Sequence, residues 1–258
     1  HQSAAAIEYG LMLDPVSNAV REVNDSSVSP EEAIKAVASY QVKRDRIHVS
    51  ITPYANYILN YVYLAPKGIT RTLRGVYPYF RYDQTDALFV GVDIDALLKI
   101  HRHFTATPRG SLLRARDVPN DSYFLFIPSN RYSLDLRYER DDFFGFKDVY
   151  LESGLQHVSR QTFSPRVVTV REIKEAEENG VDPFNGDPSI FDFAEAPEAY
   201  NLLTLAAGLS IQSEKVQYDF RLAAENLLNE RYRDYTNRFR YYADDLGRNV
   251  TFSIKCIF

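Results

Sequence analysis

Alternation of apolar and polar residues with a period of two is the feature that most constrains the fold of this chain. It is clearest near residue 135, where Tyr132, Leu134, Leu136 and Tyr138 alternate with Ser133, Asp135, Arg137 and Glu139. Successive side chains of a β-strand point to opposite faces of a sheet, so such a segment has one apolar face and one polar face. The longest apolar run, 202–211, is interrupted by polar residues and a glycine. No segment reaches the ~20 apolar residues of a membrane-spanning helix, and the alternation predicts an all-β fold.

The spacing of the alternating segments predicts how they are connected. Nine strands are expected, at about 33–42, 47–64, 87–100, 105–116, 130–140, 149–155, 203–211, 216–224 and 250–258. Short turns near Arg44, His101, Phe143 and Glu214 alternate with longer loops at 65–87, 117–129, 162–199 and 232–248. Short turns at one end and long loops at the other are typical of outer-membrane β-barrels, and this pattern puts the C-terminus on the periplasmic side. Pro53 has no N–H to donate, which predicts a bulge or bend in the second strand.

The polar strand faces indicate contact with water. Asp219, Arg221 and Glu225 share one face of a predicted strand, and unpaired buried charges are very costly. This face would fit a wet barrel lumen or the solvent side of a β-sandwich, but not a dry core. A net charge of −5 with no basic run gives no sign of a nucleic-acid partner. The single cysteine, Cys256, excludes an intrachain disulfide.

The C-terminal region carries a recognisable order of motifs. The run Glu225-Asn226-Leu227-Leu228-Asn229-Glu230-Arg231-Tyr232 is followed by a loop, then by Gly247-Arg248-Asn249, and then by a strand ending in Phe258. This order resembles the C-terminal end of TonB-dependent outer-membrane receptors. Segments near 60–64, 80–87 and 126–131 also resemble the barrel of this family, and the resemblance covers about Pro30 to Phe258.

The resemblance implies a transmembrane antiparallel β-barrel of about 22 strands that encloses a plug, of which this chain would supply about nine C-terminal strands. Nine open strands would leave two unpaired edges in lipid, so a larger barrel is expected. Residues 1–33 are predicted to be an extracellular loop segment, and residues 34–258 the C-terminal part of the barrel. The plug domain and the front strands are expected to be missing from this sequence. No signal peptide opens the chain.

The resemblance also implies a location and partners. We expect the bacterial outer membrane, with contacts to its lipid, to the plug and remaining strands, and to a TonB-type energy-coupling protein. The barrel-assembly machinery is a further expected partner, because it reads a terminal aromatic strand in this family. The residues expected to form that assembly signal are Phe252, Ile254, Cys256 and Phe258.

The implied function is a receptor and active importer of a scarce ligand, most often an iron–siderophore, otherwise haem, cobalamin or an oligosaccharide. Two other classes stay open, a passive porin or adhesin barrel and a secreted β-rich binding module. The two C-terminal motifs favour the importer, and a plug domain upstream of His1 would distinguish it from the others. No nucleophile elbow, phosphate loop or catalytic dyad is found, so neither an enzyme nor a cofactor is expected.

Candidate ligand-binding residues lie in the predicted loops, where binding residues are usually placed on a rigid scaffold. They are Tyr77, Tyr79, Tyr82, Arg238, Arg240, Tyr241 and Tyr242. Arginine and aromatic side chains can bind an anionic or aromatic ligand by bidentate pairing and stacking. The alternative is structural: arginines would pair lumen acids, and tyrosines would lie at the membrane interface.

Two further features each have two interpretations. Loop 162–199 carries nine acidic and three basic residues between 163 and 198. It is either a cation or ligand contact or a solvated loop, with a predicted surface helix at 170–179 that ends at Gly180. His101 and His103 could ligate a metal, but a solvated periplasmic turn is expected there, and no metal site is predicted.

Overall fold

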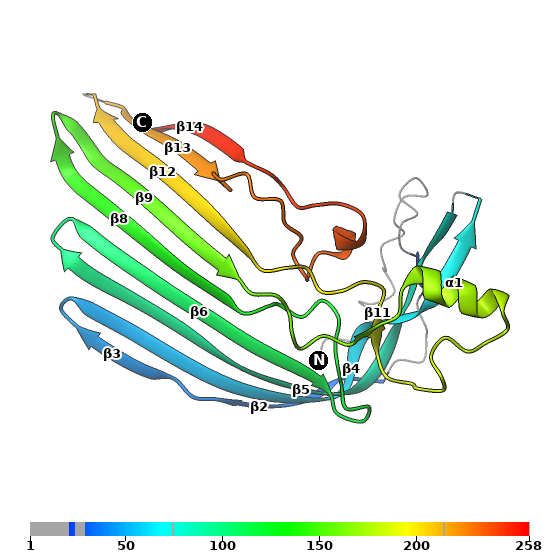
Figure 1. Ribbon diagram of the computed structural model, residues 1–258. Coiled ribbons are helices and arrows are strands. Elements are labelled where there is room, and N and C mark those ends of the chain that lie inside the picture. Colours follow the sequence, from blue (N-terminus) through cyan, green and yellow to red (C-terminus); the bar gives the residue numbers. More distant parts are fainter. Residues whose placement is uncertain (1–20, 24–28, 74, 214, 258) are drawn as a thin grey trace.

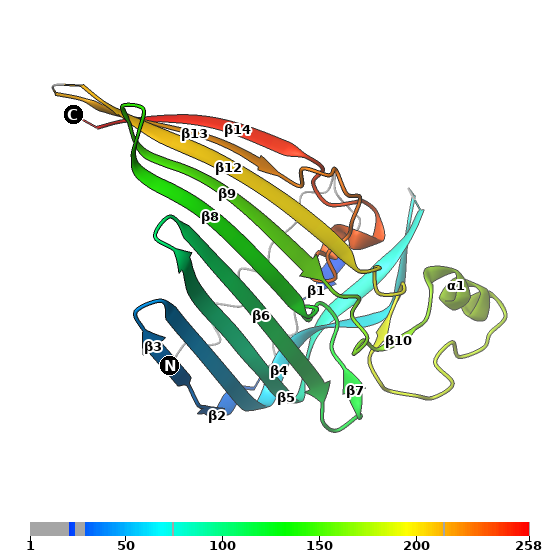
Figure 2. The ribbon, with the colours of Figure 1, turned by 60° about the vertical axis from the view of Figure 1, so that its left-hand side comes forward.

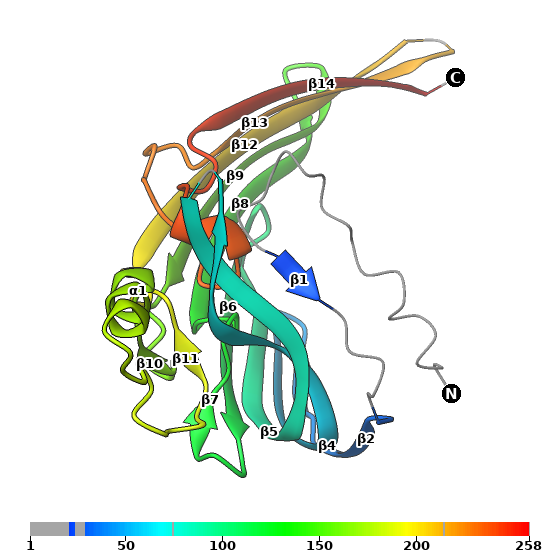
Figure 3. The same ribbon diagram turned by 90° about the vertical axis from the view of Figure 1, so that its right-hand side faces the viewer.

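The computed structural model describes residues 21–23, 29–73, 75–213 and 215–257. Most of their strands form one large twisted sheet (Figure 1), and two short strands form a separate pair. Nine strands form a wall in the order β14-β13-β12-β9-β8-β6-β5-β4-β2, and all neighbours are antiparallel. Their bounds are β2 Glu32–Val37, β4 Ile47–Thr72, β5 Gly75–His101, β6 Phe104–Asp117, β8 Arg131–Phe143, β9 Phe146–Val158, β12 Tyr200–Gln212, β13 Gln217–Glu225 and β14 Asn249–Ile257. The predicted all-β class with about nine wall strands is confirmed. The wall is curved, as Figure 3 shows.

Three short strands pair with this wall. β1 (Arg21–Val23) runs parallel to residues 79–81 of β5, and β7 (Ser122–Tyr123) pairs with the end of β6. β3 (Tyr40–Arg44) continues the line of β2 along β4. Of the predicted loop segment 1–33, residues 1–20 and 24–28 lie outside the described residues, and the first wall strand begins at Glu32.

Pro53 explains why β2 and β3 are separate strands. Val37 pairs with Tyr54 and Tyr40 with Ile51, so the register is the same on both sides of the gap. The Ala38 N–H donates to the Pro53 carbonyl at 3.1 Å, but Pro53 has no N–H to return. The proline therefore interrupts the ladder, and of the predicted bulge or bend the bulge is not found, because the register does not shift at Pro53. The register shifts of β4 against β5 lie further along, at 58–61 and 66–68.

The turns and loops follow the predicted asymmetry with one correction. Short turns join β3 to β4, β5 to β6, β8 to β9 and β12 to β13, whereas long segments join β6 to β8, β9 to β12 and β13 to β14. The predicted loop at 65–87 is wrong, because β4 and β5 continue as a paired hairpin as far as Thr72 and Gly75. Gly68, at φ +128°, allows the chain to pass the irregularity after Pro66. This hairpin extends past the ends of the other strands (Figure 1).

The two faces of the wall have the predicted chemistry. Leu155 of β9 lies between Leu134 of β8 and Leu203 of β12, which continues one apolar row across three strands. This face is open: Leu136 is 45% exposed and Phe252 is 62% exposed. Exposed apolar surface of this extent marks a face covered by lipid or by a partner.

β14 presents part of the predicted assembly signal on this apolar face. Phe252 lies opposite Leu222 and Ile254 opposite Phe220, and Cys256 is an exposed free cysteine. Phe258 lies outside the described residues. The role of these residues in assembly stays a prediction.

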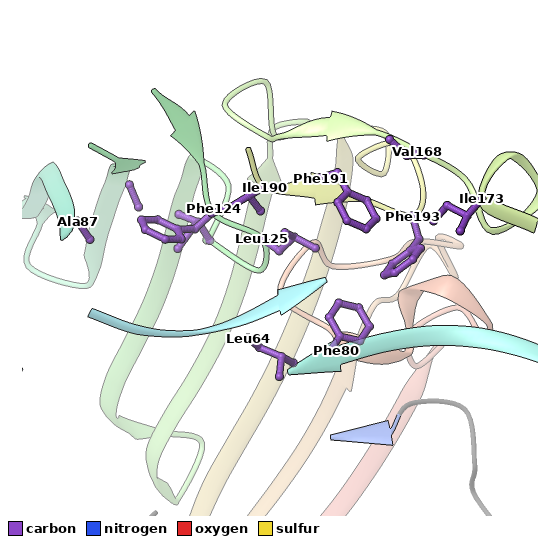
Figure 4. Close-up of a cluster of buried hydrophobic side chains, with 12 residues drawn as sticks. Leu64, Phe80, Ala87, Phe124, Leu125, Val168, Ile173, Ile190, Phe191 and Phe193 are labelled. Atoms are coloured by element: carbon purple, nitrogen blue, oxygen red, sulfur yellow. The ribbon is translucent and has the colours of Figure 1, made fainter. Parts of the chain in front are cut away.

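The apolar core lies at the loop end of the wall rather than between layers. Helix α1 (Val170–Glu178), together with β10 (Arg166–Val167) and β11 (Phe191–Asp192), lies beyond the strand ends (Figure 2). The buried cluster consists of Leu64, Phe80, Ala87, Ala115, Phe124, Leu125, Ile127, Val168, Ile173, Ile190, Phe191 and Phe193 (Figure 4). The long connections are therefore packed against the β4–β5 hairpin.

Helix α1 confirms the predicted surface helix. The Thr169 hydroxyl accepts the Glu172 N–H at 3.2 Å, and the Glu172 carboxylate accepts the Thr169 N–H at 2.7 Å. This capping box satisfies two donors at the helix start. Among the described residues, no helix has both the length and the apolar character needed to cross a membrane.

Candidate functional site

Opposite charges form a ladder across the polar face of the wall. Arg109 of β6 contacts Asp95 of β5 at 3.2 Å through Nε and Asp135 of β8 at 2.5 Å through Nη1. Arg137 follows Asp135 by two residues on β8, toward the short turns, and contacts Glu152 of β9 at 2.9 Å. These side chains are partly exposed, so each pair contributes little stability, and the face is suited to water or to polar partners.

A cavity of about 420 Å³ lies between this face and the connection from β13 to β14. The wall and the connection supply both charged and neutral hydrogen-bonding groups. Its lining includes Arg109, Asp135, Gln156, Thr204, Glu225 and Tyr232. The last loop therefore overhangs the polar face.

Asp234 fixes the root of this last loop to the wall. Its carboxylate accepts hydrogen bonds from Arg131 Nη2 of β8 at 2.6 Å and from the Tyr200 hydroxyl of β12 at 2.7 Å. Burial acts to raise the pKa of Asp234, but hydrogen bonds from Thr236 and Tyr200 and the charge of Arg131 outweigh it and lower the pKa below its usual value. The carboxylate therefore stays ionised and joins two strands to the loop.

Asn226 and Asn229 give the C-terminal motif a structural role that the sequence reasoning did not assign. The buried Asn226 side chain accepts the Glu230 N–H at 2.8 Å and donates to the carbonyls of Glu230 at 2.9 Å and Leu246 at 3.3 Å. Asn229 Oδ1 accepts the Arg248 N–H at 3.0 Å. The two asparagines thus connect the first motif to the second across the loop.

Two of the predicted ligand-binding residues face inward. Arg240, in the 3₁₀ helix η2 (Arg238–Tyr241), is 3% exposed and forms an ion pair with Asp192 of β11. The Tyr241 hydroxyl donates to Asp192 Oδ1 at 2.8 Å. The structure therefore places Arg240 and Tyr241 in contacts between two loops, and ligand contact by these two residues stays a prediction. Asp192 was not singled out by its sequence context.

The other predicted residues divide into two groups. Tyr82 packs against the buried cluster. Tyr77 and Tyr79 are half-buried on the extended hairpin, Arg238 is exposed, and Tyr242 is partly covered, with 42% of its surface exposed. We call Tyr77, Tyr79, Arg238 and Tyr242 the rim residues. The Tyr77 phenol contributes to the raised pKa of Tyr242, and ligand contact at the rim stays a prediction.

Alkaline titration is expected to distinguish Tyr242 from an ordinary surface tyrosine. Burial first, and then the neighbouring Tyr77 phenol, raise the pKa of Tyr242 to about 12, compared with about 10 for a free phenol. The contribution of Tyr242 to stability is therefore present below pH about 10 and is lost as the pH rises toward 12. The tyrosinate absorbance of the native protein minus that of Tyr242→Phe measures this ionisation. A difference curve centred at the free-phenol value would contradict the burial.

The two remaining candidates show no ligand geometry. His103 Nδ1 lies 3.1 Å from the Glu139 carbonyl at the short-turn end. Within the described part of the chain, no group of three or more histidine, cysteine or acidic residues could hold a metal ion. Arg160, just before loop 162–199, contacts Glu195 and Glu198 of the loop at 3.1 and 2.7 Å, so these two acids are ion-paired.

No family model matches the sequence, and no curated protein matches it at a significant level. Solved structures do match. The chain superposes on the copper transporter OprC with a TM-score of 0.64 and 14% identity, over 90% of this chain and 31% of that one. BauA, the ferric preacinetobactin receptor from Acinetobacter baumannii, matches with a TM-score of 0.58 and 15% identity, over 87% of this chain and 29% of that one. The FrpB iron transporter from Neisseria meningitidis matches with a TM-score of 0.60 and 9% identity, over 92% of this chain and 33% of that one.

These neighbours define the class of fold. They are TonB-dependent outer-membrane receptors, and the chain has the fold of part of their barrel. The predicted resemblance is confirmed at the level of the fold. The chain spans about 30% of the length of these solved structures, and its nine wall strands form an open sheet with edges at β2 and β14.

Proposed function

We propose that this chain is the C-terminal part of the barrel of an outer-membrane receptor that imports a scarce ligand. The observation that carries the proposal is the wall itself, which combines an open apolar face, a charged polar face and packed loops at one end. The apolar face would contact outer-membrane lipid, and the polar face would enclose an aqueous lumen. A secreted binding module would have to cover this apolar face in another way.

The proposal includes the partners that such a receptor needs. The edges at β2 and β14 would pair with the remaining strands, because unpaired strand edges are not viable in lipid. A plug would fill the lumen, a TonB-type protein would supply the energy, and the barrel-assembly machinery would insert the barrel. Binding and transport are proposed rather than catalysis.

An iron–siderophore is the proposed ligand class. The neighbours support it by name, since BauA is a ferric preacinetobactin receptor and PfeA from Pseudomonas aeruginosa a ferric enterobactin receptor. OprC, a copper transporter, shows that the same fold carries other cargo. Haem, cobalamin and oligosaccharides are alternative ligands, and a passive porin or adhesin is the alternative function.

Energy dependence separates these functions. Cells that produce the full-length protein would be given radiolabelled ferric preacinetobactin, ferric enterobactin or Cu²⁺, with and without a protonophore. An energised importer accumulates one of these probes only without the protonophore, whereas a passive porin equilibrates it in both conditions. Equal uptake in both conditions would exclude active import of that probe.

Alanine at the rim is expected to weaken ligand binding. Tyr77→Ala and Tyr242→Ala each remove an aromatic contact of the type that dominates binding sites, so each should raise the dissociation constant by about tenfold or more. Tyr40→Ala is the matched control, because Tyr40 is an exposed tyrosine at the opposite end of the wall. Surface abundance should be equal in all three variants. Unchanged affinity in both rim variants would place the contacts on parts of the receptor outside this chain.

A further inference from the structure

A buried ion pair joins two long loops that are distant in sequence. Asp192 belongs to β11 in the β9–β12 connection, and Arg240 belongs to η2 in the β13–β14 connection. Both side chains are 1% exposed. Charges removed so completely from water need close partners to be tolerated.

The surroundings supply those partners. Asp192 accepts hydrogen bonds from Arg240 Nη2, from the Tyr241 hydroxyl at 2.8 Å and from the Tyr235 hydroxyl at 3.3 Å. The Arg240 guanidinium lies 4.4 Å from the ring centre of Tyr241 and 4.5 Å from that of Tyr235. Burial, and then the charge of Asp192, raise the pKa of both tyrosines, which keeps their hydroxyls protonated as donors.

The same cluster connects to the other loop-end elements. Phe126, from the β7–β8 connection, lies 5.7 Å from the Arg240 guanidinium. Phe80 of the β4–β5 hairpin contacts Phe193 and Tyr241, with ring centres 5.2 and 6.3 Å away. One ion pair thus lies where four chain segments meet.

The closed arrangement is not fully satisfied. Arg240 Nε is buried and has no hydrogen-bond partner. A buried donor without an acceptor raises the free energy of the state that contains it. The root of the loop, by contrast, is held independently through Asp234 and Asn226.

We propose that Asp192 and Arg240 form a latch that closes the tip of the last loop, residues 236–244, onto the β9–β12 connection, while the root of the loop stays fixed to the wall. Tyr242 follows Tyr241 in this tip, and their ring centres lie 6.2 Å apart, so opening of the latch would move Tyr242 and change access to the rim. The link to ligand capture rests on the proposed function, whereas the latch itself does not.

Hydrogen–deuterium exchange in the full-length protein, in outer-membrane preparations, tests the latch directly. Asp192→Asn leaves the buried Arg240 charge unpaired, so amide exchange over 236–244 should rise by about tenfold or more. Exchange in β8 and β12 should stay unchanged. The control is Asp244→Asn, which removes the negative charge from the exposed Arg233–Asp244 ion pair of 2.7 Å in the same loop and should change exchange less than about twofold.

Milder and compensating variants keep the test decisive if Asp192→Asn does not assemble. Tyr241→Phe removes one hydrogen bond to Asp192 and should raise exchange over 236–244 to a smaller extent. Asp192→Asn combined with Arg240→Met leaves no unpaired buried charge and should assemble better than Asp192→Asn alone. The latch is overturned if exchange over 236–244 is the same in Tyr241→Phe, Asp244→Asn and the native protein.

A binding measurement tests two claims separately, the effect of the latch on the rim and the proposed ligand class. With ferric preacinetobactin or ferric enterobactin as the probe, Asp192→Asn should change the dissociation constant by about tenfold or more, and Asp244→Asn should leave it unchanged. If neither probe binds the native protein, the proposed ligand class fails while the exchange result still decides the latch. If a probe binds the native protein and Asp192→Asn alike, control of the rim is overturned.

Discussion

Replacing Leu136 by arginine is expected to lower the unfolding free energy of the barrel by about 2–4 kcal/mol, the cost of a charge facing lipid near the bilayer midplane. Leu136 lies on the apolar face of β8, opposite Ala106 of β6 and Ser153 of β9. None of these neighbours can neutralise a guanidinium. The variant should show a lower urea midpoint in bilayers and less barrel in the outer membrane.

Ser133→Arg is the matched control on the same strand. Ser133 lies on the polar face, where it borders the cavity and the ion-paired Arg109. A second arginine there meets repulsion from Arg109, but water and Asp135 screen it, so a loss of less than about 1 kcal/mol is expected. Equal losses in the two variants, measured by the same titration, would show that the two faces are assigned wrongly.

The wall could be predicted because its information is local. A period of two in the sequence translates directly into two faces, and a one-residue slip would expose the wrong face along a whole strand. This is why the facing of Leu134 and Leu136 follows from the sequence alone. The turns near His101 and Phe143 follow as well, because polar and glycine residues interrupt the period there.

The extended β4–β5 hairpin could not be predicted in the same way. Pro66, Gly68, Gly75 and Pro78 are residues that normally mark loops, yet the strands pair through them. Tertiary packing decides the outcome, because Phe80 is 1% exposed among side chains from three other connections. Local propensity carries no information about those partners.

The location of the candidate site could be predicted from the sequence, but the roles of its individual residues could not. Arginines and tyrosines in the last loop indicate either ligand binding or ion pairing, and only the position of Asp192 decides for Arg240. The two residues are 48 positions apart in sequence. Asn226 and Asn229 lay inside the recognised motif, but their hydrogen bonds to residues 230–248 depend on the closed loop.

Asn226 is expected to be the most sensitive position of the last loop outside the latch. It is 5% exposed and adopts the left-handed region, at φ 46°. Asparagine tolerates this conformation better than most residues, and its side chain is short enough to bond the nearby backbone. Alanine at this position would lose the three hydrogen bonds and add backbone strain, so Asn226→Ala should cost about 2–4 kcal/mol.

Asn226→Gly separates the two causes of this loss. Glycine adopts the left-handed region without strain, so Asn226→Gly should be less destabilised than Asn226→Ala by about 1 kcal/mol. The remaining loss measures the hydrogen bonds, because the Glu230 N–H loses its side-chain acceptor in both variants. Denaturant titration of the full-length protein in bilayers gives both values. If both variants unfold at the native midpoint, the motif does not hold the loop root, and Asp234 alone must anchor the last loop to the wall.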